Sequence, residues 1–418
     1  MAFVFPWRRS RLTGVVVSLA LAGLALAGCV THEGVLLPLG STVPGASTVD
    51  MLVATTRAPS SEPGVLFSGA RGTSLSLDNI VVSIPPDQNR TIGEIAWPDK
   101  LPPDPNTDFS VVRVSPLDAD GAHRWYDSVV GPSRRVLIFV HGFNNRYEEA
   151  VYRFAQIVHD SNMEAAPVLF TWPSGGSVFD YNYDRESTTY SRTALEMILT
   201  QAAASPDIDN ITIMAHSMGS WLTMEALRQL AIRRGHLPDK IDNVILASPD
   251  LDVDVFEKQI QEIDTTRTRI TLFTSQDDRA LSLSRRIAGG VDRLGAIDAN
   301  KEPYRSELEA AGITVLDLSA LRAGDATNHN KFAASPEVVR LIGGRLIAGQ
   351  KVTDADVSLG EHIGALTLGT AQTIGSAAGA VATLPIAIID PSARESLGDQ
   401  LESTGQHLGG TLQTAVGQ

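Results

Sequence analysis

The stretch Ile211-Thr-Ile-Met-Ala-His-Ser-Met-Gly-Ser220 decides the fold of this 418-residue chain. Its apolar, β-branched start predicts a buried strand, and the pattern from Gly219 to Arg234 predicts a helix. A strand that turns sharply into a helix at a serine is a nucleophile elbow, which exposes a reactive hydroxyl. Small residues flank Ser217 because the two backbones pass close together, and Ala215 stands where the first glycine usually lies.

A second signal precedes the elbow. The apolar run Val136–Val140 predicts another buried strand, and His141-Gly142-Phe143-Asn144 follows it. A strand followed by His-Gly is where serine hydrolases of this type place one oxyanion donor, and the residue after the nucleophile supplies the other. We therefore expect an oxyanion hole made by the backbone N–H groups of Phe143 and Met218. Together the two signals predict a serine hydrolase.

Serine needs a general base, and in this fold class the base follows the last strand of the sheet. The run Ile313–Leu318 predicts that strand, and the next histidine is His329, placed before a helix predicted over Pro336–Ile347. We therefore predict His329 as the base. His216 and His141 are expected to have structural roles, His141 by orienting its loop through local hydrogen bonds.

The acid that orients the base has several candidates. Asp277 and Asp278 follow the predicted strand Ile270–Phe273, and Asp250 and Asp252 follow the preceding one. The usual position is after the later strand, and the second aspartate there has the usual spacing, so Asp278 is preferred. Each of these aspartates could instead cap a helix.

The rest of the chain alternates strands and helices. Apolar runs without charges predict parallel strands covered on both faces. We therefore predict an α/β fold with a mostly parallel central sheet and helices on both faces, over residues 49–348. Early strands are expected over Val49–Thr56, Leu77–Ile84, Thr91–Trp97 and Phe109–Val114.

Residues 1–28 predict a lipoprotein signal peptide. Arginines precede a short apolar run, and Leu26-Ala27-Gly28-Cys29 is similar to a bacterial lipobox. Cys29 is the only cysteine, so it cannot form an internal disulfide. We expect lipidation at Cys29, a tether over residues 29–48 and a location in the bacterial cell envelope, anchored to a membrane.

The composition of the chain limits the classes of molecule that we expect it to bind. The formal net charge of −14 and the lack of a basic stripe argue against nucleic acid, and no metal-ligand spacing or cofactor motif is seen. The Gly/Ala-rich segment 349–418 predicts a helical or flexible appendage, with a membrane insert as a weaker alternative. Neither the oligomeric state nor the choice of membrane follows from the sequence.

Several stretches together resemble the bacterial DUF900 family of the α/β-hydrolase fold. They are Ala54–Arg57, Phe139–Asn145, Phe170–Ser174 with Tyr181 and Asp184, Ala215–Gly219, Asp278–Leu281, and His329 with Phe332–Pro336. The family commonly has serine and an aromatic residue after the histidine, whereas Asn330 and Lys331 stand here. The resemblance implies a hydrolase, expected to cleave a small-molecule or lipid ester. An acyltransferase, a thioesterase or a non-catalytic envelope binding lipoprotein are the alternatives.

Overall fold

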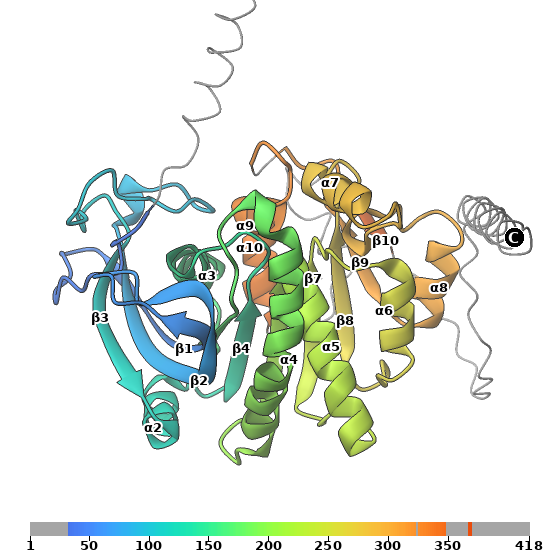
Figure 1. Ribbon diagram of the computed structural model, residues 1–418, viewed down its shortest axis with the longest axis horizontal. Coiled ribbons are helices and arrows are strands. Elements are labelled where there is room, and N and C mark those ends of the chain that lie inside the picture. The colour runs from blue at the N-terminus through green and yellow to red at the C-terminus, as the bar shows by residue number, and fades with distance from the viewer. Residues whose placement is uncertain (1–31, 323–324, 348–366, 370–418) are drawn as a thin grey trace, which may run out of the picture.

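A ten-stranded sheet forms the centre of the computed structural model, which describes residues 32–322, 325–347 and 367–369 (Figure 1). The strand order is β10-β9-β8-β7-β6-β4-β5-β1-β2-β3. The strands are β1 (Ser47–Pro59), β2 (Phe67–Ile84), β3 (Ser110–Leu117), β4 (Arg135–Val140), β5 (Ala166–Thr171), β6 (Asn210–His216), β7 (Ile241–Ala247), β8 (Arg269–Thr274), β9 (Thr314–Asp317) and β10 (Thr367–Gly369). All neighbours from β9 to β1 are parallel, while β10 and β2 pair antiparallel with them.

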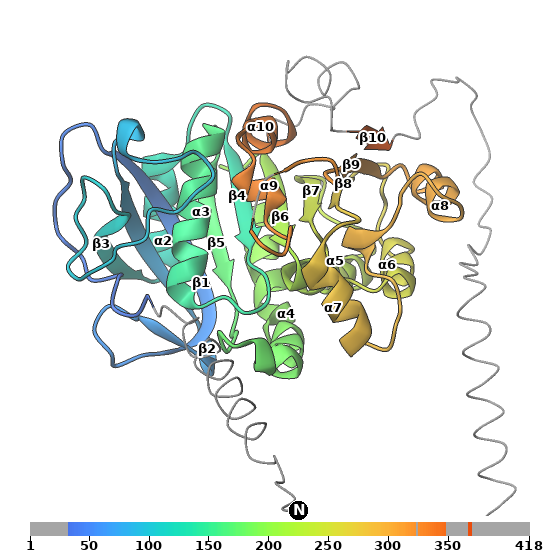
Figure 2. The ribbon, with the colours of Figure 1, turned by 90° about the horizontal axis from the view of Figure 1, so that it is seen from above.

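Helices cover both faces of the sheet (Figures 1 and 2). They are α2 (Ala119–Val129), α3 (Tyr147–Ser161), α4 (Tyr181–Ala204), α5 (Met218–Arg234), α6 (Val253–Ile260), α7 (Arg279–Ile287), α8 (Tyr304–Ala310), α9 (Lys331–Ala334) and α10 (Pro336–Leu341). One core lies between the sheet and α2, α4, α5, α6 and α8. The other lies beneath α3, α9 and α10. The predicted α/β fold, with a mostly parallel sheet and helices on both faces, is confirmed.

Strand β4 shows why the sequence forms a sheet that is buried on both sides. Val136, Ile138 and Val140 belong to the first core, and Leu137 and Phe139 to the second. Successive side chains of a strand point to opposite faces, so a continuous apolar run fills both cores. The absence of polar alternation therefore places β4 in the middle of the sheet.

The prediction of a free tether over residues 29–48 is wrong for residues 34–36, which are buried, and for residues 47 and 48, which begin β1. Val35 and Leu36 are 2% and 0% exposed. The hydroxyl of Tyr152 on α3 donates to the carbonyl oxygen of Val35 at 2.9 Å, and Pro38 forms a bridge with Val111 of β3. The glycine and proline content of this segment suggested a free linker. Its apolar residues Val35 and Leu36 instead pack into the second core, beside α3. The packed domain therefore begins before Val49.

The expected strand Thr91–Trp97 is also wrong. This segment is a turn followed by chain without regular secondary structure, and Ile95, Ala96 and Trp97 pack against the second core without pairing in the sheet. The predicted signal peptide and Cys29 lie outside the described residues. So does the predicted 349–418 appendage, except for Thr367–Gly369, which forms the edge strand β10.

Among residues 32–322, 325–347 and 367–369, no helix combines the length and the apolar character needed to cross a membrane. No group of three or more histidine, cysteine, aspartate or glutamate side chains in those ranges is placed to hold a metal ion.

Candidate active site

Ser217 occupies a strained turn between β6 and α5. Its backbone has φ 51° and ψ −124°, a conformation that residues other than glycine rarely adopt. The turn is held from the end of β7, because the N–H of Ser217 donates to the carbonyl of Ala247 at 2.9 Å and its carbonyl accepts from the N–H of Asp250 at 3.1 Å. A Cβ on Gly219 would lie 2.3 Å from the carbonyl oxygen of His141. The elbow therefore requires its second glycine.

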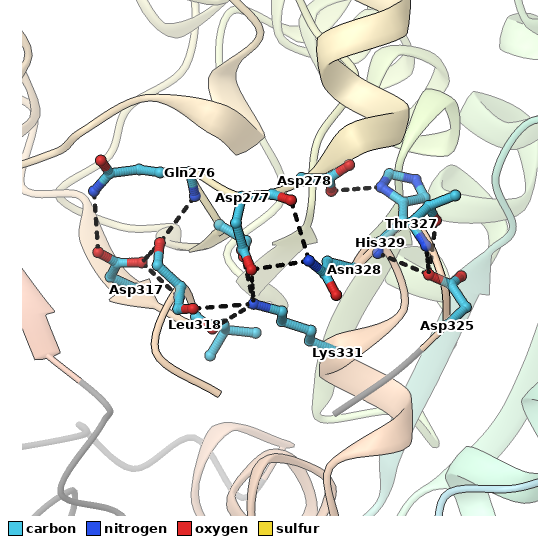
Figure 3. A network of polar contacts seen from close by, with 12 residues as sticks. Gln276, Asp277, Asp278, Asp317, Leu318, Asp325, Thr327, Asn328, His329 and Lys331 are labelled. Carbon is cyan, nitrogen blue, oxygen red and sulfur yellow. Dashed lines mark hydrogen bonds and ion pairs between the residues drawn. The ribbon is translucent and has the colours of Figure 1, made fainter. Parts of the chain in front are cut away.

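His329 and Asp278 form a close, buried pair. The Nδ1 of His329 lies 2.6 Å from Oδ2 of Asp278, whose side chain is fully buried (Figure 3). A carboxylate at this distance fixes the proton on Nδ1 and leaves Nε2 as the nitrogen that can accept one. Burial alone would lower the pKa of His329, but the hydrogen bond and charge of Asp278, with the charges of Asp250 and Asp325, raise it overall.

Asp278 has two roles at once. Its Oδ2 contacts His329, while its Oδ1 accepts the N–H of Leu281 at 2.9 Å and so caps α7. The other three candidate acids are used elsewhere: Asp250 pairs with Arg293, Asp252 caps α6 through the N–H groups of Asp254 and Val255, and Asp277 binds Lys331. Among the four aspartates, the geometry singles out Asp278 as the partner of His329.

His216 links the elbow to the His329 loop. Its ring centroid lies 4.7 Å from that of His329 and 4.6 Å from that of Phe332. Burial, with the nearby charge of His329, lowers the pKa of His216 well below its usual value, so the ring stays neutral. This agrees with the structural role expected for His216. The packing places His329 directly beside the residue that precedes Ser217.

The expected oxyanion loop packs against the elbow. A Cβ on Gly142 would lie 3.0 Å from the Cβ of Ser217, so the loop after β4 approaches the serine closely. Met218 is the first residue of α5, where backbone N–H groups lack partners within the helix. The ring of Phe143 packs edge-on against Tyr181 at 5.4 Å. Both predicted donors therefore lie at the elbow, and their role stays a prediction.

Asp184 is a site residue to which the sequence assigned no role. Its side chain is fully buried on α4. It accepts the backbone N–H groups of Asn144 at 3.1 Å and Gly175 at 2.8 Å, and the hydroxyl of Ser174 at 2.5 Å. Burial raises the pKa of Asp184 despite these donors. One carboxylate thus joins the loop after β5 to the loop that carries Phe143.

Arg57 and His141 hold the other side of the same loop. Arg57 is 1% exposed and donates to the carbonyl of Asn145 at 2.7 Å and to the hydroxyl of Thr171 at 2.9 Å. The ring of His141 contacts the carbonyl of Gly142 through Nδ1 and accepts the N–H of Trp172 at Nε2. Burial and the charge of Arg57 lower the pKa of His141 to about 3, so the ring is neutral. The local bonding expected for His141 is confirmed.

Lys331 joins the acid and base loops. Its side chain is 1% exposed, and Nζ donates to Asp277 at 2.7 and 2.9 Å and to the carbonyl oxygens of Leu318 and Ser319 at 3.1 and 3.2 Å (Figure 3). Asn328 adds a bond to Asp277 at 2.9 Å. Lys331, at which the sequence departs from the family pattern, therefore forms an ion pair with Asp277 close to His329.

The fold and this site define the chain as an α/β hydrolase by architecture. More narrowly, it belongs to the family described as alpha/beta hydrolase of unknown function (DUF900), whose model matches residues 121–345. The resemblance seen in the sequence is confirmed.

Two further comparisons describe similar proteins. An uncharacterized protein of Nostoc sp. is 31% identical over 123 residues, which cover 23% of this chain and 32% of that protein. The chain thus spans about a third of that relative's length. A lipase-esterase related protein from Clostridium acetobutylicum is 17% identical, with a TM-score of 0.21 over 44% of this chain and 75% of that one.

Proposed function

We propose that this protein is a serine hydrolase that cleaves carboxylic esters through an acyl-enzyme at Ser217. The observation that carries the proposal is the buried pair of His329 and Asp278, 2.6 Å apart, packed beside a strained serine elbow. A strained nucleophile turn with an oriented histidine behind it matches the needs of acyl transfer, in which serine must lose a proton as it attacks.

The proposed mechanism follows from the positions of these groups. Ser217 attacks the ester carbonyl carbon while Nε2 of His329 takes the hydroxyl proton. Asp278 keeps the ring oriented and stabilises its charged form. The oxyanion is stabilised by the N–H groups of Phe143 and Met218, and His329 then returns the proton to the leaving alcohol. Water, activated by the same histidine, hydrolyses the acyl-enzyme.

The loop that carries Phe143 is built to be rigid before substrate binds. Asp184 fixes the N–H of Asn144, and Arg57 fixes the carbonyl of Asn145. Donors held in place in advance need no reorganisation when negative charge develops, which is the main source of oxyanion stabilisation. This favours a catalyst over a binding module, because a binding module has no need of a preorganised oxyanion loop.

The test is covalent labelling of the full chain with a fluorophosphonate probe, beside Ser217→Ala. We expect one label per chain, absent in the variant, and turnover of p-nitrophenyl esters that is lost with it. The products of turnover with added alcohols or thiols separate hydrolysis from acyl transfer. A folded wild-type protein that neither labels nor turns over would refute the proposal and favour a binding lipoprotein.

We also propose that the protein is exported and anchored by lipid at Cys29 in the bacterial cell envelope. The support is the sequence before residue 30, with its arginines, short apolar run and Leu-Ala-Gly-Cys ending. The intact mass of the wild-type protein should include acyl chains, and Cys29→Ser should lose both that mass and membrane association. A wild-type protein without lipid mass would refute this assignment.

A further inference from the structure

The chain is fixed to the domain at the edge of the oxyanion loop as soon as the described residues begin. The ring of His32 stacks on Trp97 at 3.9 Å. Glu33 forms an ion pair with Arg146 at 2.7 Å, and Arg146 follows Phe143 by three residues. Residues 32 and 33 therefore lie on the face of the domain that carries the proposed active site.

Contacts lead from Arg146 to two exposed apolar residues. A Cβ on Gly176 would lie 2.7 Å from Cγ of Arg146, so the loop after β5 packs on that side chain. The 3-10 turn η2 (Val178–Asp180) follows, and Val178 and Phe179 are 63% and 93% exposed. A phenylalanine this exposed next to the proposed active site leaves an apolar surface that no other described residue covers.

The same face continues onto α7. Tyr181 directly follows η2, and its hydroxyl lies 2.9 Å from that of Ser284 on α7. On this helix Leu283 and Ile287 are 57% and 51% exposed. They are four residues apart and so share one side of the helix. We call Val178, Phe179, Leu283 and Ile287 the apolar rim.

Helix α7 is basic in an acidic chain. It contains three arginines and no acidic residue, whereas the chain carries a net charge of −14. Arg285 is paired with Asp292, but Arg279 and Arg286 are exposed. Exposed apolar residues beside exposed arginines on a short amphipathic helix are typical of segments that lie in the surface of an anionic membrane.

We propose that the apolar rim rests in an anionic lipid surface, so that the active site faces the membrane and takes its ester substrate from it. The proposal rests on the proposed function and on the anchor at Cys29. Only two residues separate Cys29 from His32, so the anchor lies within about 10 Å of residue 32 along the chain. A free 20-residue tether would instead reach up to about 70 Å and would leave the orientation open.

The first arm of the test measures how the domain is oriented on the membrane and does not depend on enzymatic activity. Because Cys29 is the only cysteine and its thiol is consumed by the anchor, Phe179→Cys and Leu283→Cys can each be labelled with a polarity-sensitive fluorophore. The control is Ile232→Cys, which is 53% exposed near the end of α5, about 21 Å along the helix from Met218. The lipidated full chain is reconstituted in phosphatidylethanolamine and phosphatidylglycerol vesicles that contain brominated lipid.

We expect the labels at 179 and 283 to shift to the blue and to be quenched by brominated lipid, while the label at 232 stays aqueous. A second arm compares turnover of an ester dissolved in the vesicles with turnover of a soluble short ester. The double variant F179S/L283S should lower the ratio of these rates about tenfold, and I232S should leave it unchanged.

The failures of the two proposals can be told apart. Aqueous labels at 179 and 283 in a protein that hydrolyses soluble esters would overturn the membrane orientation and leave the hydrolase intact. Membrane-buried labels in a protein without any esterase activity would support the orientation and overturn the function. If the labels are shielded equally with and without vesicles, the rim is covered by protein, and the proposal of a lipid partner is wrong.

Discussion

Replacing Lys331 by methionine tests whether the two loops that carry Asp278 and His329 are held in register by the ion pair beside them. Lys331 donates to both carboxylate oxygens of Asp277 and to the carbonyls of Leu318 and Ser319. Methionine keeps most of the length of the unbranched side chain but removes every donor. It therefore frees the turn before Asp278 and leaves two carbonyls at the end of β9 without this partner.

The magnitude follows from burial. Nζ is buried, but the side chain of Asp277 is 44% exposed, so water stabilises the carboxylate once its partner is lost. The carbonyl of Leu318 still accepts the N–H of Leu321, so the loss of the lysine's bonds to two carbonyls and the loss of the ion pair together cost about 2 kcal/mol of folding stability. Misplacement of a catalytic group by about 1 Å costs up to about 100-fold in rate, and the Asn328–Asp277 bond is retained, so we expect a loss of about 10- to 30-fold in kcat.

The assay is ester hydrolysis with a double-mutant cycle. If Lys331 and Asp277 act as one unit, the double variant with Asp277→Asn should be no slower than Lys331→Met alone. Lys240→Met is the matched control, because Lys240 donates to the carbonyl of Ser205 beyond the opposite end of the sheet. It should lower stability in urea with little change in kcat. Equal kcat values for the two lysine variants would refute the positioning role of Lys331.

Four further outcomes are expected. Asp278→Asn should lower kcat/KM about 10³- to 10⁴-fold and Asp250→Asn far less, and the reverse ranking would move the acid to the end of β7. Since the pKa of His329 is raised, wild-type kcat/KM should rise with pH through a midpoint above 6.5, and that midpoint should fall in residual Asp278→Asn activity because burial then dominates. Gly219→Ala should cost about 3 kcal/mol or more in urea unfolding, because its Cβ would lie 2.3 Å from a backbone oxygen, and wild-type stability would show that the elbow can relax. Asp184→Asn should lower kcat about tenfold with little change in KM, because it weakens the bonds that hold the oxyanion loop to the loop after β5, and an effect confined to KM would instead indicate a role in substrate binding.

The sequence predicted the parts of the fold that depend on short-range pattern. Apolar runs such as Val136–Val140 predict central strands, because a strand without polar side chains must be covered on both of its faces. The partner of His329 was also predictable, since the carboxyl ends of adjacent parallel strands meet at one edge of the sheet. The spacing from the strand favoured Asp278 over Asp277, and the structure shows what separates them: Asp278 is buried against His329, whereas Asp277 is partly exposed and binds Lys331.

Other features depend on contacts between distant segments. Val35 and Leu36 lie in a stretch with the composition of a linker, and only the surface of α3 shows that they are buried. Asp184 and Lys331 bind loops that are far away in sequence. An isolated polar residue shows no period and no local motif, so its role appears only when the strands bring its partners together.

The capping of α7 by Asp278 makes helix formation and assembly of the acid–base pair one event. The carboxylate that contacts His329 is also the acceptor for the first turn of α7. Slow hydrogen exchange at the amide of Leu281 should therefore report how often the pair is intact. Any ligand or lipid that stabilises the first turn of α7 would therefore also hold Asp278 in place against His329.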